Sequence, residues 1–201
     1  QNGYLNRSRV SLDYIPRDNN HPYRPAIIFR MAEAYLSYAE ALNESSERMS
    51  HKQEILDNLN KIRHRAGIAE YGTGTDENGF TRIKINFSDQ KEVRRLIHKE
   101  RRVEFVGEGV RYHDLRRWKT AHYGIGNLNE QGENPDWGVN GPDYGMNYYG
   151  TEYTDQGDNA FFKRTKYMDR VYPRKFYWYP IHQSEIDKDP TLVQGPFWLG
   201  E

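Results

Sequence analysis

Residues 96–121 constrain the fold more than any other stretch, because they combine a helical apolar stripe with densely placed charges of both signs. Apolar side chains recur here at the spacing of one helical face: Val93, Leu96, Ile97, Val103 and Val106. Glu100 falls inside this stripe, where a buried carboxylate requires a charged or hydrogen-bonding partner. Arginine is the natural partner, since its planar guanidinium can hold a carboxylate through two parallel bonds.

A glycine-bounded corner at Gly107 and Gly109 interrupts the stripe. An apolar pattern then restarts at Tyr112, Leu115 and Trp118, which predicts a second helix. Ser88 or Asp89 can cap the first one. We therefore expect an arginine-rich helix pair over residues 89–121. Carboxylates and arginines are interleaved along this helix pair, which favours a structural ion-pair network over a binding site for an anion. The predicted members of the network are Glu100, Arg101, Arg102, Glu104, Arg111, Asp114, Arg116 and Arg117.

Residues 26–67 predict a helical hairpin. The first helix should run from about Ala26 to Ser45, with a broad apolar stripe at Ile28, Met31, Ala32, Tyr35, Tyr38, Ala39 and Leu42. The second carries Ile55, Leu56, Leu59, Ile62 and Ala66 on one face and should end at Gly67. Small residues that allow close helix approach make the pair similar to one tetratricopeptide repeat, and one such repeat cannot bury its apolar face alone.

Several segments together resemble the C-terminal region of the SusD/RagB family, surface nutrient-binding lipoproteins of Bacteroidetes-type bacteria. They occur in the order found in that family: residues 28–44, 59–68, 100–105, 107–118, 177–186, 189–194 and Trp198. His182 is a departure, because the family more often has a second proline there. Family members are normally much longer, so the resemblance implies that residues 1–201 are the C-terminal part of one SusD/RagB-like domain.

Two regions lack a helical period. Residues 71–86 contain turn-forming glycines and partly alternating apolar residues, which predict a loop with a short ribbon. Residues 122–170 predict a long, aromatic-rich loop region, followed by a C-terminal segment over 171–201. Sugars present apolar C–H faces and hydroxyls, so aromatic rings beside amides and carboxylates suit them. The candidate ligand-binding residues are Trp137, Tyr144, Tyr148, Tyr149 and Tyr153; alternatively, these rings pin the loop onto the helices.

Bulk properties exclude several classes of function. The 29 basic and 29 acidic residues balance, so the net charge of the protein does not favour binding to nucleic acid or to an anionic membrane. The hydrophobic fraction of 36% lies below that of ordinary globular domains, which predicts surfaces that need a covering partner. The seven histidines and the absence of cysteine give no metal-ligand pattern, and no nucleophile elbow or phosphate loop occurs. We expect no catalytic residue, no cofactor and no metal.

The combined expectation is a mainly α protein of SusD-like type, with tetratricopeptide-like helical hairpins, long irregular loops and minor β-structure. The resemblance implies non-catalytic binding of a glycan, or in some relatives a peptide, and delivery to a SusC-like TonB-dependent barrel. It also implies a place on the extracellular face of the outer membrane, with the lipid anchor and the missing N-terminal part outside this sequence. The alternatives are a helical-repeat adaptor for protein partners and a secreted glycoside hydrolase.

Overall fold

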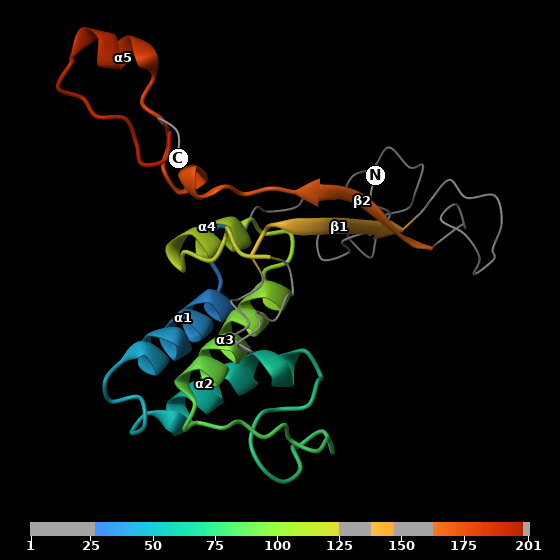
Figure 1. The fold of residues 1–201 in the computed structure, drawn as a ribbon. Coiled ribbons are helices and arrows are strands. Elements are labelled where there is room, and N and C mark those ends of the chain that lie inside the picture. Colours follow the sequence, from blue (N-terminus) through green and yellow to red (C-terminus); the bar gives the residue numbers. More distant parts are fainter. Residues whose placement is uncertain (1–26, 125–137, 147–162, 199–201) are drawn as a thin grey trace. The chain divides into compact units, whose positions relative to one another are not determined.

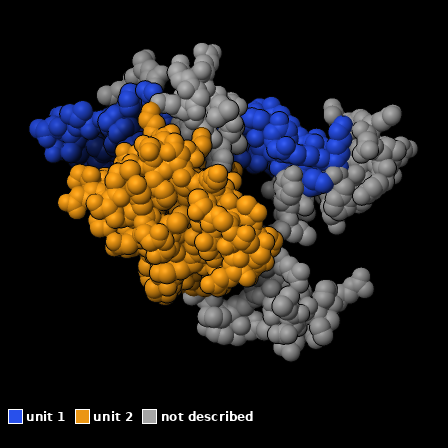
Figure 2. Space-filling model, turned by 90° about the horizontal axis from the view of Figure 1, so that it is seen from below, with its two compact units in different colours: residues 1–5, 112–201 blue, residues 6–111 orange. Residues whose placement is uncertain are grey.

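The fold of the chain is given by a computed structural model, which describes residues 27–124, 138–146 and 163–198. Helices dominate these residues, and a two-stranded sheet completes the regular structure (Figure 1). The described residues fall into two compact units that divide between Arg111 and Tyr112 (Figure 2). The mainly α fold with minor β-structure is thus confirmed.

The first unit in chain order, unit 2 in Figure 2, is built on three helices: α1 (Met31–Glu44), α2 (Lys52–Arg65) and α3 (Gln90–Glu104). Helix α1 packs against both α2 and α3, so the predicted hairpin of α1 and α2 gains a third helix as its cover. The centre of this core consists of fully buried aliphatic side chains: Leu36, Ala39, Ile55, Leu59, Val93 and Ile97. Their burial removes apolar surface from water and is the main stabilising term of the unit.

Two helix ends follow their sequence signals. The side chain of Asp89 accepts hydrogen bonds from the backbone N–H groups of Lys91 and Glu92 and so caps α3, as predicted. Gly67 follows α2 with a φ of 65°, and its N–H donates to the carbonyl of His64. This left-handed residue satisfies a free carbonyl at the helix end, as predicted for a glycine in that position.

Two predictions about apolar stripes were wrong. Helix α1 begins at Met31 and not near Ala26, and Ile28 is 96% exposed. The extended backbone of Arg30, with φ −146° and ψ 155°, keeps the preceding residues out of the helix. Val103 on α3 and Val106 just after it are exposed, whereas Phe105, which caps the helix, is buried. The buried face runs through Val93, Ile97, Arg101 and Phe105 at intervals of four, so the valines lie on the other side.

Between α2 and α3 the chain forms a loop with isolated bridges. Tyr71 pairs with Ile83 and Thr75 pairs with Thr81. Asp76 fixes the turn between them by accepting hydrogen bonds from the backbone N–H groups of Glu70, Asn78 and Phe80. Burial opposes ionisation of this carboxyl, but the three donors prevail and lower its pKa below the ordinary value.

The second unit in chain order, unit 1 in Figure 2, begins at Tyr112 within helix α4 (Val110–Arg117). Strands β1 (Gly141–Met146) and β2 (Arg164–Arg170) pair antiparallel, with an irregularity between Asp143 and Tyr144. Both strands lie within the predicted loop region of residues 122–170, so this region contains the minor β-structure of the fold at positions that the sequence did not indicate. Glycine, proline and aspartate in β1 and the charged residues of β2 hide the strand pattern, since these types are depleted in strands.

The remaining chain is a 3-10 helix, η1 (Arg174–Tyr177), and the short helix α5 (Gln183–Lys188). Leu115, Ala121 and Tyr172 form the small core of this unit. His182, which stands where the family more often has proline, caps α5: its side chain accepts a hydrogen bond from the N–H of Ser184. Of the helices in the described ranges, none is long and apolar enough to cross a membrane.

Candidate functional site

Glu100 is the buried centre of the charged region of α3. Its Oε1 atom lies 2.6 Å from Nη1 of Arg63 and accepts a hydrogen bond of 2.7 Å from the hydroxyl of Tyr71. The guanidinium of Arg63 also lies over the Tyr71 ring, 4.4 Å from its centroid. Burial raises the pKa of Tyr71, and the neighbouring carboxylate raises it further. Glu100 therefore joins α3 to α2 and to the loop that follows α2.

Glu104 and Glu108 take partners from other elements as well. Arg30 lies between them: its Nη2 and Nε atoms donate to the Glu108 carboxylate at 2.9 and 3.0 Å, and Nη1 donates to Glu104. Arg65 of α2 also pairs with Glu104. Arg30, Arg63 and Arg65 were not among the residues predicted for the ion-pair network. Their basic character was visible in the sequence, but nothing in it indicated which carboxylate each would reach.

The other members of the predicted network are placed as follows. Arg101 is buried and donates a hydrogen bond of 3.1 Å to the hydroxyl of Ser37, and its Nε lies 4.0 Å from Glu40. Arg102 and Arg111 both have interaction partners. In the second unit, Nε of Arg117 donates to Asp114 at 3.0 Å. Arg101 therefore joins α3 to α1, whereas the Arg117–Asp114 pair lies within α4.

All the described hydrogen bonds of Arg116 go to uncharged acceptors. Its guanidinium donates to the hydroxyls of Tyr112 and Tyr172 at 3.0 and 3.1 Å and to the carbonyl of Tyr177 at 2.7 Å. It also donates to the carbonyl of Phe176. The guanidinium of Arg116 thereby attaches α4 to η1 and to the residues just before it.

Of the candidate ligand-binding residues, the structure describes Tyr144. It lies half-buried on β1, and the guanidinium of Arg164 on the paired strand covers its ring at 4.1 Å from the centroid. Such stacking leaves one face of the ring occupied. Trp137, Tyr148, Tyr149 and Tyr153 lie outside the described residues.

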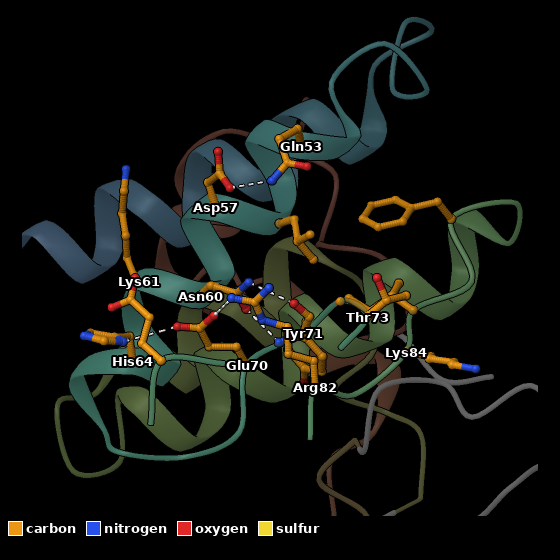
Figure 3. Close-up of a pocket in the computed structure, with 15 residues that line it drawn as sticks. Gln53, Asp57, Asn60, Lys61, His64, Glu70, Tyr71, Thr73, Arg82 and Lys84 are labelled. Atoms are coloured by element: carbon orange, nitrogen blue, oxygen red, sulfur yellow. Dashed lines mark hydrogen bonds and ion pairs between the residues drawn. The ribbon is translucent and has the colours of Figure 1, made fainter. Parts of the chain in front are cut away.

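The first unit contains a large open groove of about 860 Å³ between the outer face of α2 and residues 70–87. Figure 3 shows Gln53, Asp57 and Asn60 along the helix, with Thr73 and Arg82 on the opposite wall. Apolar side chains contribute to the lining as well: Leu56, Ile85 and Phe87. The groove thus combines polar groups with apolar surface.

The walls of the groove are fastened to each other by hydrogen bonds. The amide of Asn60 donates to the Tyr71 carbonyl at 2.9 Å and accepts from the Tyr71 N–H at 2.8 Å. The Glu70 carboxylate accepts a hydrogen bond of 2.9 Å from the guanidinium of Arg82, and it lies 3.2 Å from the ring nitrogen Nδ1 of His64. These contacts fix the loop wall against α2, so the groove is formed before any ligand arrives.

Sequence reasoning did not identify this groove. Its helical wall reads as an ordinary solvated face, with polar residues at Gln53, Asp57, Asn60, Lys61 and His64. The available signal was the helical spacing of these polar residues, which places Asn60 on one face with Asp57, Lys61 and His64. Among the residues that the structure describes, no cluster of histidine and acidic side chains could hold a metal ion.

Comparison with known proteins agrees with the resemblance. The sequence model of the SusD family matches residues 1–198. SusD-like protein P25 of Formosa agariphila is 32% identical over 109 residues, 54% of this chain and 18% of that protein. SusD-like protein P38 of the same organism is 32% identical over 103 residues, 51% and 19% of the two chains. The chain thus spans about a fifth of the length of the curated relatives it matches.

Solved structures share the fold. BT4246, in its selenomethionine form, is similar with a TM-score of 0.55 and 28% identity, over 88% of this chain and 25% of that one. A SusD-like protein, BF3747, from Bacteroides fragilis gives 0.54 and 26% identity, over 86% and 26%. The family model extends over almost the whole sequence and the solved relatives carry the same arrangement of helices, so this chain belongs to the SusD family.

Proposed function

We propose that this protein binds a nutrient glycan at the cell surface, without catalysing a reaction, and passes it to a SusC-like TonB-dependent transporter. The observation that carries the proposal is the match of the SusD family model to residues 1–198. The two relatives described above are named SusD-like, in agreement with this role. We place the protein on the extracellular face of the outer membrane for the same reason.

The structure supports a binding role through the contacts that link its helices. The Arg63–Glu100 pair joins α2 to α3 and the Arg101–Glu40 contact joins α3 to α1. A scaffold linked in this way loses little entropy when a ligand binds. We propose that aromatic side chains of the second half of the chain contact the glycan: Trp137, Tyr144, Tyr148, Tyr149 and Tyr153. Tyr144 would offer the ring face that Arg164 leaves open.

Calorimetric titration of the purified protein against a broad panel of soluble oligosaccharides tests the proposal. We expect binding heat with at least one sugar family. If no glycan in the panel produces heat, the proposal fails and the helical-repeat adaptor becomes the better explanation. Incubation with polysaccharides, followed by chromatography, should release no shorter sugars; their appearance would show a hydrolase instead.

The transporter is tested separately, because glycan binding does not require it. Affinity purification of the protein from membranes of its native host should recover a TonB-dependent barrel in comparable amount. Recovery of the protein without such a barrel, under detergent conditions that keep other outer-membrane complexes intact, would contradict the delivery step and leave the binding step standing.

A further inference from the structure

We propose that the groove between α2 and residues 70–87 is a second carbohydrate site, which takes a short neutral oligosaccharide; the inference rests on the proposed glycan-binding function. Tyr144, the candidate aromatic residue that the structure describes, belongs to the other compact unit, so the groove is built from different elements (Figure 2). A volume of about 860 Å³ lies within the range of ligand pockets, which is roughly 300 to 1,000 Å³.

The charges that line the groove favour an uncharged ligand. Three carboxylates and three basic side chains contribute to the lining, and they are interleaved: Asp57, Glu70 and Glu77 with Lys61, Arg82 and Lys84. Because the two signs balance, neither a polyanion nor a polycation gains from the field of the groove. Neutral hydroxyl groups, in contrast, can accept from the basic groups and donate to the carboxylates.

The distribution of apolar surface suits a sugar ring. Leu56, Ile85 and Phe87 contribute apolar lining beside the polar groups. A sugar presents C–H groups on its faces and hydroxyls around its edge, so apolar surface can meet the faces while polar side chains bind the edge. A purely apolar ligand would leave the polar groups of the groove without partners.

Several polar groups of the groove are not used by the fold. Within the described residues, nothing accepts a hydrogen bond from the buried Nε of Arg82. A buried donor without an acceptor is unfavourable. Because this atom has almost no accessible surface, a ligand can accept from it only after the Arg82 side chain turns toward the groove. Thr73 and Lys84 lie on the same loop wall with exposed side chains (Figure 3). Neither side chain is needed for the contacts that hold the loop to α2.

A glycine keeps the groove open. Gly72 lines it with a φ of 134°, a conformation that L side chains rarely adopt. A Cβ atom built there would lie 3.3 Å from Cδ of Arg82 and 3.8 Å from Cδ2 of Leu56, so a longer side chain would occupy the groove. The backbone N–H of Gly72 donates a hydrogen bond of 2.8 Å to the carbonyl of Ile83, and this bond holds the loop in the open form.

The test uses rim residues that the fold does not need. Thr73→Trp should fill the groove, and Lys84→Ala should remove a hydrogen-bond donor. Thr81→Trp, on the same loop outside the lining, and Lys99→Ala, on the exposed surface of α3, are the matched controls. Malto-, xylo- and β-gluco-oligosaccharides serve as neutral probes, an oligogalacturonate as the anionic probe, and an unstructured peptide as the protein-like probe.

Calorimetry and nitrogen-edited NMR give the readouts. We expect a neutral oligosaccharide to shift the Nε–H signal of Arg82 and the amide signals of residues 72 and 73. Thr73→Trp should abolish these shifts, and Lys84→Ala should weaken the corresponding binding event about tenfold, while both control variants bind like the wild type. Thermal unfolding of each variant confirms that it is folded.

The outcomes separate this inference from the proposed function. If a neutral sugar produces heat but the Arg82 signal does not move and Thr73→Trp binds normally, the groove is not a sugar site and the proposed function stands. If no sugar produces heat, both fail. A response at Arg82 to the peptide or the anionic probe alone overturns the assignment of a neutral carbohydrate.

Discussion

Replacement of Glu100 by leucine is the sharpest test of how the first unit is held together. The side chains of Glu100 and Arg63 are 7% and 10% exposed, and their charged atoms are 2.6 Å apart. Leucine is close to glutamate in volume, so the change removes the charge without opening a large cavity. Arg63 would then keep a buried positive charge without its anionic partner.

The cost of such a change follows from desolvation. Removal of one partner of a buried ion pair typically costs about 3–5 kcal/mol, because the remaining charge is not compensated. Loss of the acceptor for the Tyr71 hydroxyl acts in the same direction. We therefore expect Glu100→Leu to lower the free energy of unfolding by about 3–5 kcal/mol, a large part of the roughly 5–15 kcal/mol of a typical domain.

The double variant Arg63→Met with Glu100→Leu distinguishes desolvation from simple loss of contacts. Substitution of a whole buried pair by apolar residues of similar size is often neutral or stabilising. The double variant should therefore be more stable than Glu100→Leu alone, which means that the two changes are strongly non-additive. Glu47→Leu, a change at a carboxylate that is 80% exposed, is the control and should alter stability by less than about 0.5 kcal/mol.

Urea unfolding followed by circular dichroism measures these differences, with the slope against denaturant as the check on two-state behaviour. The reasoning is refuted if Glu100→Leu costs less than about 1 kcal/mol. It is equally refuted if the double variant loses the sum of the two single losses, since the pair would then act as two independent contacts.

Three further predictions concern a helix cap, a turn and an arginine. Asp89→Ala should destabilise α3 by about 1 kcal/mol, and Asp89→Asn, which can still accept the amide hydrogen bonds, should cost less; equal losses in urea unfolding would exclude the capping role. The lowered pKa of Asp76 means that its contribution to stability is present above the ordinary value of 3.8 and is lost as pH falls through the folded-state pKa. The stability difference between wild type and Asp76→Asn should therefore shrink below about pH 4, and a difference that is constant with pH would contradict this. Arg116→Ala should lower the melting temperature and speed hydrogen exchange in residues 172–179 more than it weakens glycan binding, whereas a stable variant that no longer binds would show a ligand-binding arginine.

Local signals predicted the parts of the fold that depend on a few neighbouring residues. Asp89 and Gly67 mark helix ends because their caps are made with the next residues of the chain. Helical periodicity identified the buried residues Val93 and Ile97, because the period of the helix places residues four apart on the same face. It failed at Ile28, because α1 begins only at Met31. It failed at Val103, because periodicity does not say which side of α3 the neighbouring helices cover.

The strands and the groove could not be predicted in this way. The pairing of β1 with β2 joins residues 141 and 170, and it overrides the poor strand propensity of the glycines and charged residues involved. The groove needs Asn60 to hold Tyr71, and Arg82 to reach Glu70. The sequence of this loop shows turn formers and partly alternating apolar residues, which do not indicate either contact. These contacts are set by the folded path of the loop and not by any local pattern.

The sequence by itself determined the family, the helical class and the need of Glu100 for a basic partner. It determined these because residue type and spacing fix helix periodicity, and because an anion inside an apolar stripe must be compensated wherever it folds. Only the tertiary structure decided that the partner is Arg63, that Arg30 bridges Glu104 and Glu108, and that α2 forms one wall of a groove. Many arginines are chemically equivalent candidates, and the packing of helices far apart in sequence selects among them.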